Sequence, residues 1–110
     1  MKERIDLETA TLYHGDNVEI MQSLPDCSVD AVVTDPPYGL SQHTPEVVAA
    51  ALRAWLAGET FVPSKGLKGF MGKSWDSFVP GPEVWREVLR VLKPGGHCLV
   101  FAGTRSDDLM

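Results

Sequence analysis

The residues best suited to chemistry in this sequence are consecutive: Asp35-Pro36-Pro37-Tyr38. The Asp35 carboxylate accepts hydrogen bonds, and the Pro36 carbonyl is a second acceptor that neither a helix nor a sheet ladder readily uses. Tyr38 adds a flat ring for stacking. Two acceptors beside a stacking ring suit the amino edge of a nucleobase that has been flipped out of its duplex.

A strand is expected to position these four residues. The run from Val29 to Thr34 is apolar and β-branched and lies between polar residues, which predicts a buried strand. Proline has no backbone N–H for a sheet ladder, so Pro36 and Pro37 end this strand and stiffen the loop that follows. Open α/β sheets bind ligands at the carboxyl ends of their strands. The sequence therefore predicts a ligand site at this end of the strand.

These residues also carry a resemblance to a known family. The stretch Val-Val-Thr-Asp-Pro-Pro-Tyr-Gly at 32–39 resembles the catalytic motif of amino-group DNA methyltransferases, Asp/Asn/Ser-Pro-Pro-Tyr/Phe/Trp. Residues 12–30, which begin Leu-Tyr-His-Gly-Asp-Asn, and residues 85–96, which end Leu-Lys-Pro-Gly-Gly, are similar to the same family. A four-residue motif alone matches often by chance, so the preceding strand and the two flanking matches are needed for the assignment. The resemblance is weakest between residues 43 and 62.

The resemblance implies a partial Rossmann-like, S-adenosylmethionine-dependent methyltransferase fold of the α/β class, with a mainly parallel sheet and flanking helices. It implies that Asp35, Pro36, Pro37 and Tyr38 are catalytic. Asp35 and the Pro36 carbonyl would hold the amino hydrogens of a flipped base, Tyr38 would stack on the base, and the amino nitrogen would attack the sulfonium methyl of S-adenosyl-L-methionine in line. No metal is implied.

Asp at the first motif position favours adenine-N6 as the methylated atom, by resemblance. Cytosine-N4 methylation stays open, as does an RNA or protein amide methyltransferase with a similar loop. The expected partner is double-stranded DNA, and a second copy of the chain or a cognate restriction enzyme are further candidate partners. The expected location is the cytoplasm of a bacterial or phage-infected host cell.

The segment before the motif predicts a β-α-β unit. Residues 1–9 are polar and read as a frayed lead-in, residues 9–14 as a strand, and residues 18–24 as a short helix. Its strands should be parallel and its connection right-handed. Asp16 or Asn17 can cap the helix, and the resemblance implies that Asp16, Asn17 and Asp35 contact the cofactor. Capping and cofactor contact both stay open for Asp16 and Asn17.

The segments after the motif predict two more helices and a strand. Residues 45–56 have helical spacing after a Thr44 cap, and residues 83–92 form a second amphipathic helix. The turn at 93–96 should end that helix, and residues 97–101 should form a third, apolar strand of a parallel sheet. We expect Trp55 to be a core residue and Trp85 to pack under the sheet.

The segment 63–75 is the one basic stretch, and it is rich in glycine. Its lysines are candidate DNA contacts in a mobile loop that closes over cofactor or DNA; a solvated loop is the alternative. It is not a phosphate-binding P-loop, because Leu67 stands where that motif needs glycine. The candidate DNA-contact residues are Lys65, Lys68 and Lys73.

Composition limits the remaining possibilities. The chain has 110 residues, 44% of them apolar, and a net charge of −5, which is not typical of a self-sufficient DNA-binding domain. It has no run of apolar residues long enough for a membrane span. Cys27 and Cys98 are expected to be reduced thiols that pack in the interior.

Residues 101–105 depart from the family's Phe-x-Gly-x-Gly cofactor motif, because Arg105 replaces the last glycine. We therefore expect residues 1–110 to be the N-terminal part of one catalytic domain without its cofactor-motif half, and a non-catalytic fragment is the alternative.

Overall fold

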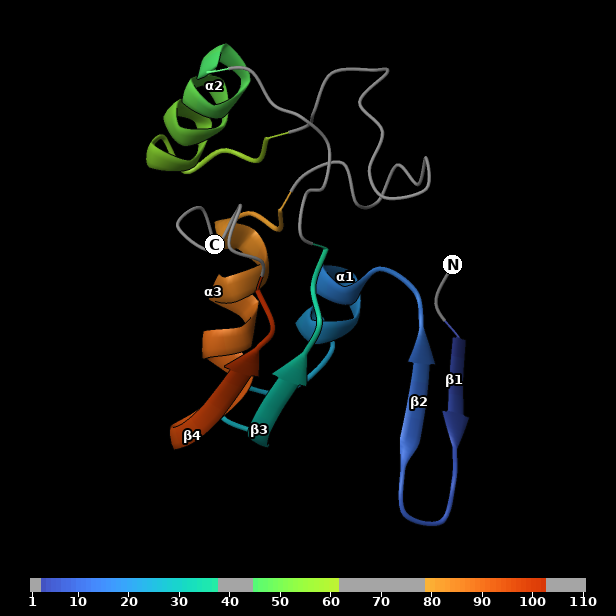
Figure 1. Cartoon of the computed structure of the whole chain (residues 1–110). Helices are drawn as coiled ribbons and strands as arrows, with labels where there is room; N and C mark the ends of the chain where they lie inside the picture. The colour runs from blue at the N-terminus through green and yellow to red at the C-terminus, as the bar shows by residue number, and fades with distance from the viewer. Residues whose placement is uncertain (1–2, 38–44, 62–78, 103–110) are drawn as a thin grey trace.

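The computed structural model describes residues 3–37, 45–61 and 79–102. These residues form a mixed α/β structure with two small sheets (Figure 1). The strands are β1 (Glu3–Asp6), β2 (Thr11–His14), β3 (Val29–Thr34) and β4 (Leu92–Val100), and the helices are α1 (Asn17–Gln22), α2 (Pro45–Leu56) and α3 (Pro82–Val91).

The elements closest to the motif lie where the sequence predicts them. The bounds of β3 and α2 coincide with the predicted ones, and α1 and α3 begin one residue early. Asp16 caps α1, because its side chain accepts a hydrogen bond from the backbone N–H of Glu19 at 3.1 Å. Pro82 occupies the first turn of α3, where proline needs no hydrogen-bond partner for its nitrogen. Thr44, the predicted cap of α2, lies outside the described residues.

The first strands pair differently from the prediction. Residues 3–6, expected to be frayed, form β1, and β2 pairs with β1 in antiparallel register, Ile5 opposite Leu12. The predicted parallel partnership of β2 with β3 is therefore wrong. A tight turn explains the change: the Leu7 N–H donates to the Ala10 carbonyl at 2.7 Å, so the chain folds straight back on itself. The partners in this hairpin, from Asp6 with Thr11 to Glu3 with His14, are close in the sequence, and such partners are reached more easily than a strand on the far side of a helix.

The third predicted strand does pair in parallel, with β3. Its register aligns Ala31 with His97 and Thr34 with Val100 (Figure 1). The predicted turn at 93–96 bulges out of this pairing, and Gly95 adopts the left-handed φ of 82° that favours glycine. At Gly96 a Cβ atom would lie 2.8 Å from the Asp30 carbonyl oxygen, so a side chain there would collide with β3.

The burial of this sheet differs from the prediction. Both strands were expected to be buried, yet Val33 is 67% exposed and Leu99 is 62% exposed. Helices α1 and α3 pack together behind the sheet in Figure 1, and within the described residues no element covers its opposite face. Cys27 and Cys98 are free and exposed, so their predicted packing role is also wrong. The buried apolar side chains are Ile20, Ala51, Val79, Val88 and Val91.

Helix α2 contributes to an apolar cluster. Ala51 and Val79 are buried together, and Val47, Trp55 and Phe61 pack against them half-buried. This confirms the predicted packing role of Trp55. The cluster joins α2 to the segment that leads into α3, so it brings Trp55 to the start of α3.

Candidate functional site

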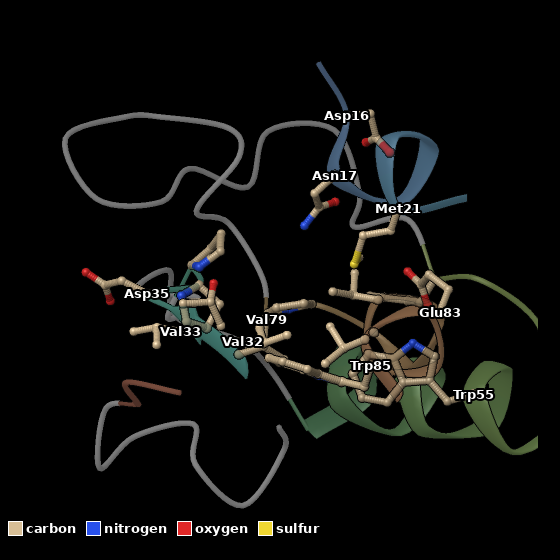
Figure 2. Close-up of a pocket in the computed structure, with 18 residues that line it drawn as sticks. Asp16, Asn17, Met21, Val32, Val33, Asp35, Trp55, Val79, Glu83 and Trp85 are labelled. Atoms are coloured by element: carbon tan, nitrogen blue, oxygen red, sulfur yellow. The ribbon is translucent and has the colours of Figure 1, made fainter. Parts of the chain in front are cut away.

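A pocket of about 700 Å³ lies where the start of α1, the end of β3 and the start of α3 meet (Figure 2). This volume is in the range of small-molecule sites. Trp55 and Phe61 close it from the side of α2. Its lining residues are Asp16, Asn17, Met21, Val32, Val33, Thr34, Asp35, Pro36, Pro37, Trp55, Phe61, Val79, Pro80, Gly81, Glu83, Val84, Trp85 and Val88.

The described motif residues, Asp35, Pro36 and Pro37, lie at the carboxyl end of β3, as predicted. The last ladder bond runs from the Phe101 N–H to the Thr34 carbonyl at 3.1 Å, and the chain leaves the sheet at Asp35. Pro36 is buried and Pro37 is half-buried, so the loop is anchored, whereas Asp35 is exposed. In Figure 2 the Asp35 carboxylate points away from Asp16 and Asn17. It can therefore be reached by a group that approaches from solvent.

Asp16 and Asn17 line the same pocket from the start of α1. The capping role of Asp16 is confirmed, while its contact with a cofactor stays a prediction. The Asn17 amide lies between the Asp16 and Asp35 sides of the pocket in Figure 2. Met21, one turn further along α1, adds a thioether to the wall. Asp16 and Asn17 at the start of α1 and Asp35 after β3 therefore line one pocket. The family resemblance implies that these three residues contact the cofactor.

The side of the pocket formed by α3 was not predicted from the sequence. Glu83 and Trp85 are half-buried and line it, where we expected Trp85 to pack under the sheet. A Cβ atom at Gly81 would lie 2.9 Å from Glu83 Oε1 and 2.9 Å from Trp55 Nε1, so both groups crowd the same point. The run Pro80-Gly81-Pro82 was the available signal, because glycine between two prolines marks a place of close approach.

Arg90 holds the α1 wall in place. Its Nη2 donates to the Met21 carbonyl at 2.6 Å, and its Nη1 donates to the Leu24 carbonyl at 3.0 Å and to Asp26 Oδ1 at 2.6 Å. Helix α1 has no basic residue in its last turn, so Arg90 supplies from α3 the positive charge that its C-terminus favours. Hydrogen bonds from Arg90 to Glu87 and then to Asp26 raise the pKa of Arg90 above its ordinary value. The guanidinium therefore stays charged.

The pocket is acidic. Asp16, Asp35 and Glu83 line it, and among the described residues that line it none is lysine, arginine or histidine. Such a lining favours a ligand that carries positive charge or amino hydrogens, and it disfavours phosphate. Trp85 Nε1 is buried and has no hydrogen-bond partner among the described residues.

Several predicted site residues lie outside the described residues: Tyr38 of the motif and the candidate DNA contacts Lys65, Lys68 and Lys73. Within the described residues, no group of three or more potential metal ligands comes together, and no helix has the length and apolar character to cross a membrane. No protein-family model matches the chain, and no solved structure matches it.

Proposed function

We propose that this chain is part of a DNA methyltransferase that transfers a methyl group from S-adenosyl-L-methionine to the exocyclic amino group of a flipped base, most favourably adenine-N6. One observation carries the proposal: Asp16 and Asn17 line the same pocket as Asp35, Pro36 and Pro37. The family resemblance implies cofactor contact for Asp16 and Asn17, and contact with the base for Asp35 and Pro36. A methyl-transfer site needs both ligands side by side.

In this function Asp35 and the Pro36 carbonyl accept the two amino hydrogens of the base. This orients the amino nitrogen and keeps its lone pair directed at the methyl group, which the sulfonium cofactor supplies when bound. The exposed position of Asp35 suits a base that arrives from a duplex outside the pocket. Burial of Pro36 fixes the loop, so most of the acceleration comes from positioning.

The acidic lining supports the choice of cofactor. S-adenosylmethionine carries a sulfonium and an ammonium, and an acidic pocket attracts both. The same lining disfavours nucleotide triphosphates. We further propose that the parallel β3–β4 pair is part of a larger, mainly parallel Rossmann-like sheet, because exposed Val33 and Leu99 are apolar side chains typical of a covered strand.

A second candidate function is ligand binding without catalysis. The observation in its favour is the direction of the Asp35 carboxylate, which points away from Asp16 and Asn17 (Figure 2). A binding pocket needs only the lining, whereas methyl transfer needs the carboxylate beside the cofactor.

The deciding experiment measures label transfer from methyl-labelled S-adenosylmethionine to unmethylated DNA, followed by digestion to nucleosides. We expect label on adenine with the parent chain, and a loss of about a hundredfold or more in Asp35→Ala, because alanine has no acceptor for the amino hydrogens of the base. Asp30→Ala is the matched control, since Asp30 is an exposed carboxylate on β3, the strand that leads to Asp35, and binds Lys93 at 2.8 Å.

Each result has a clear meaning. Equal loss in the two variants would contradict a catalytic role for Asp35. Cofactor binding by the parent without any label on DNA would favour the binding candidate. Label on cytosine instead of adenine would keep the reaction and correct the base.

A further inference from the structure

We infer that the outer edge of β1 is an interface for a second copy of this chain. The two β1 strands run antiparallel, with Ile5 opposite the partner's Ile5. The hairpin formed by β1 and β2 contributes no residue to the pocket, so the inference goes beyond the proposed function and does not depend on it.

The outer edge of β1 carries backbone groups that do not face β2. Within the described residues β1 pairs only with β2, and Figure 1 shows β1 on the side of the hairpin away from β3. The Leu7 N–H donates to the Ala10 carbonyl, so it points toward the returning strand. Because this direction alternates along an antiparallel strand and the hairpin register is regular, the N–H and C=O groups of Arg4 and Asp6 face outward.

The sequence of β1 is complementary to itself in one register. With Ile5 opposite the partner's Ile5, Arg4 lies opposite the partner's Asp6, and Asp6 lies opposite the partner's Arg4. These are the residues whose backbone groups face outward, so each pair exchanges two N–H···O=C bonds. Opposite charges directly across an antiparallel pair stabilise it. A shift of two residues in either direction places Arg4 opposite the partner's Arg4 or Asp6 opposite the partner's Asp6, which like-charge repulsion disfavours.

The charges of β1 favour an identical strand over an unrelated one. Charged side chains on an edge strand ordinarily discourage pairing with other strands. A second copy, however, presents the opposite charge at both positions. The ion pair within each copy, from Arg4 Nε to Asp6 Oδ1 at 2.9 Å, holds both side chains beside the edge. Across the interface, each arginine then lies between its own aspartate and the partner's Asp6.

The other face of the hairpin adds an apolar contact. Ile5 and Leu12 oppose each other there, and each is more than half exposed. Two copies joined along β1 bring these two side chains and the same two of the partner into one row across four strands. A two-stranded hairpin is at best marginally stable in water, whereas three or more strands with an apolar face can be stable. A second copy therefore supplies the strands that this hairpin lacks.

The first test is sedimentation equilibrium of the full chain over a range of concentrations. We expect the parent to form a dimer, and Arg4→Asp and Asp6→Arg each to weaken the association by about tenfold or more, because each places like charges opposite each other. A mixture of the two variants places aspartate opposite arginine again, so its association should return to within about threefold of the parent. Arg86→Asp is the matched control, since Arg86 is exposed on α3 and its reversal changes the net charge equally.

The double variant Arg4→Asp/Asp6→Arg guards against loss of association through unfolding of the hairpin. It keeps an ion pair within the chain and complementary charges across the interface, so it should dimerise as the parent does. A parent that stays monomeric, or a single reversal that leaves association unchanged, would overturn the interface. Loss in both single variants without recovery in their mixture would also contradict it, because the register requires that recovery.

The second test locates the edge by hydrogen exchange of the backbone amides, followed by NMR at low and high protein concentration. We expect the Arg4 and Asp6 amides to become protected at high concentration. The Thr11 and Tyr13 amides face the outer edge of β2 by the same alternation, so they serve as an internal control and should not change. Protection of Thr11 and Tyr13 instead would show that β2 forms the interface, and the inference would fail.

Discussion

The β1–β2 hairpin and the unit formed by α1, α3, β3 and β4 hold their strands in opposite ways. In the hairpin every ladder partner lies within about a dozen residues, and all eight strand residues are exposed. In the α/β unit the partners of β3 lie more than sixty residues away, on β4. The comparison shows that local closure alone makes the hairpin, whereas the unit that carries the pocket depends on bonds between distant segments.

The hairpin is stabilised by exposed side-chain contacts on one face. Arg4 Nε donates to Asp6 Oδ1 at 2.9 Å, Thr11 donates to the same oxygen at 3.2 Å, and the Arg4 guanidinium lies 5.8 Å from the centre of the Tyr13 ring. On the other face Ile5 and Leu12 oppose each other, 55% and 53% exposed. Exposed ion pairs contribute little, so this hairpin adds little to the stability of the described chain.

The α/β unit is held by contacts that only distant residues supply. Arg90 binds α1 and the loop after it, and the backbone N–H groups of Cys27 and Ser28 donate to the carbonyls of Arg90 and Val91 at 2.9 and 2.8 Å. These bonds fix the path into β3, and therefore the position of Asp35 relative to α1. A helix of six residues is not stable by itself, so α1 needs this support.

Among the changes that distinguish the α/β unit from the hairpin, we expect Arg90→Met to have the largest effect on stability. It removes the Arg90 donor to the Leu24 carbonyl, one of the donors to the Met21 carbonyl and the ion pair with Asp26, which should lower the free energy of unfolding by about 2 kcal/mol. Urea unfolding measures the change. Arg86→Met is the control, since Arg86 is exposed on the same helix. A similar loss in the control would show that helix propensity, not the bonds to α1, sets the stability.

A smaller effect is expected for Gly81→Ala. The new methyl group would lie 2.9 Å from Trp55 Nε1, and overpacking of this kind costs about 1 kcal/mol or more. Tryptophan fluorescence during unfolding reports both the stability and the change at the indole. Adding Trp55→Phe removes the crowded nitrogen, so the double variant should lose less than the sum of the two single variants. Strict additivity would contradict the proposed crowding.

The smallest effect is the acid sensitivity of the hairpin. The hydrogen bond from Arg4, the largest cause, lowers the pKa of Asp6 below its ordinary value. A lowered folded-state pKa stabilises the hairpin above the ordinary carboxyl pKa, and this contribution disappears as the pH falls through the lowered value. NMR titration of Asp6 and of the β1–β2 amides should show both together. In Asp6→Asn the hairpin amides should no longer respond in this range, while the β3–β4 amides behave as in the parent.

The sequence by itself determined the local features of this protein. The β-branched run and the two prolines define β3 and its end, Asp16 and Asn17 are the two cap candidates for α1, and the spacing of apolar residues defines α2. Each of these local features depends on backbone geometry and on residues within one turn of a helix or a few residues along a strand. Such neighbours can be read from the sequence. The position of Asp35 at a strand end was predicted for this reason, whereas its association with Asp16 and Asn17 was implied by the family resemblance.

Only the tertiary structure decided which segments meet. It paired β2 with β1 instead of β3, left Val33 and Leu99 exposed, and brought Glu83 and Trp85 into the pocket with Asp35. It also gave Arg90 its role, since nothing near Arg90 in the sequence identifies the Met21 carbonyl as its partner. Pairing and burial depend on which distant surfaces are available to each other, and several partners can satisfy the same local pattern, so the competition is settled only when the whole chain folds.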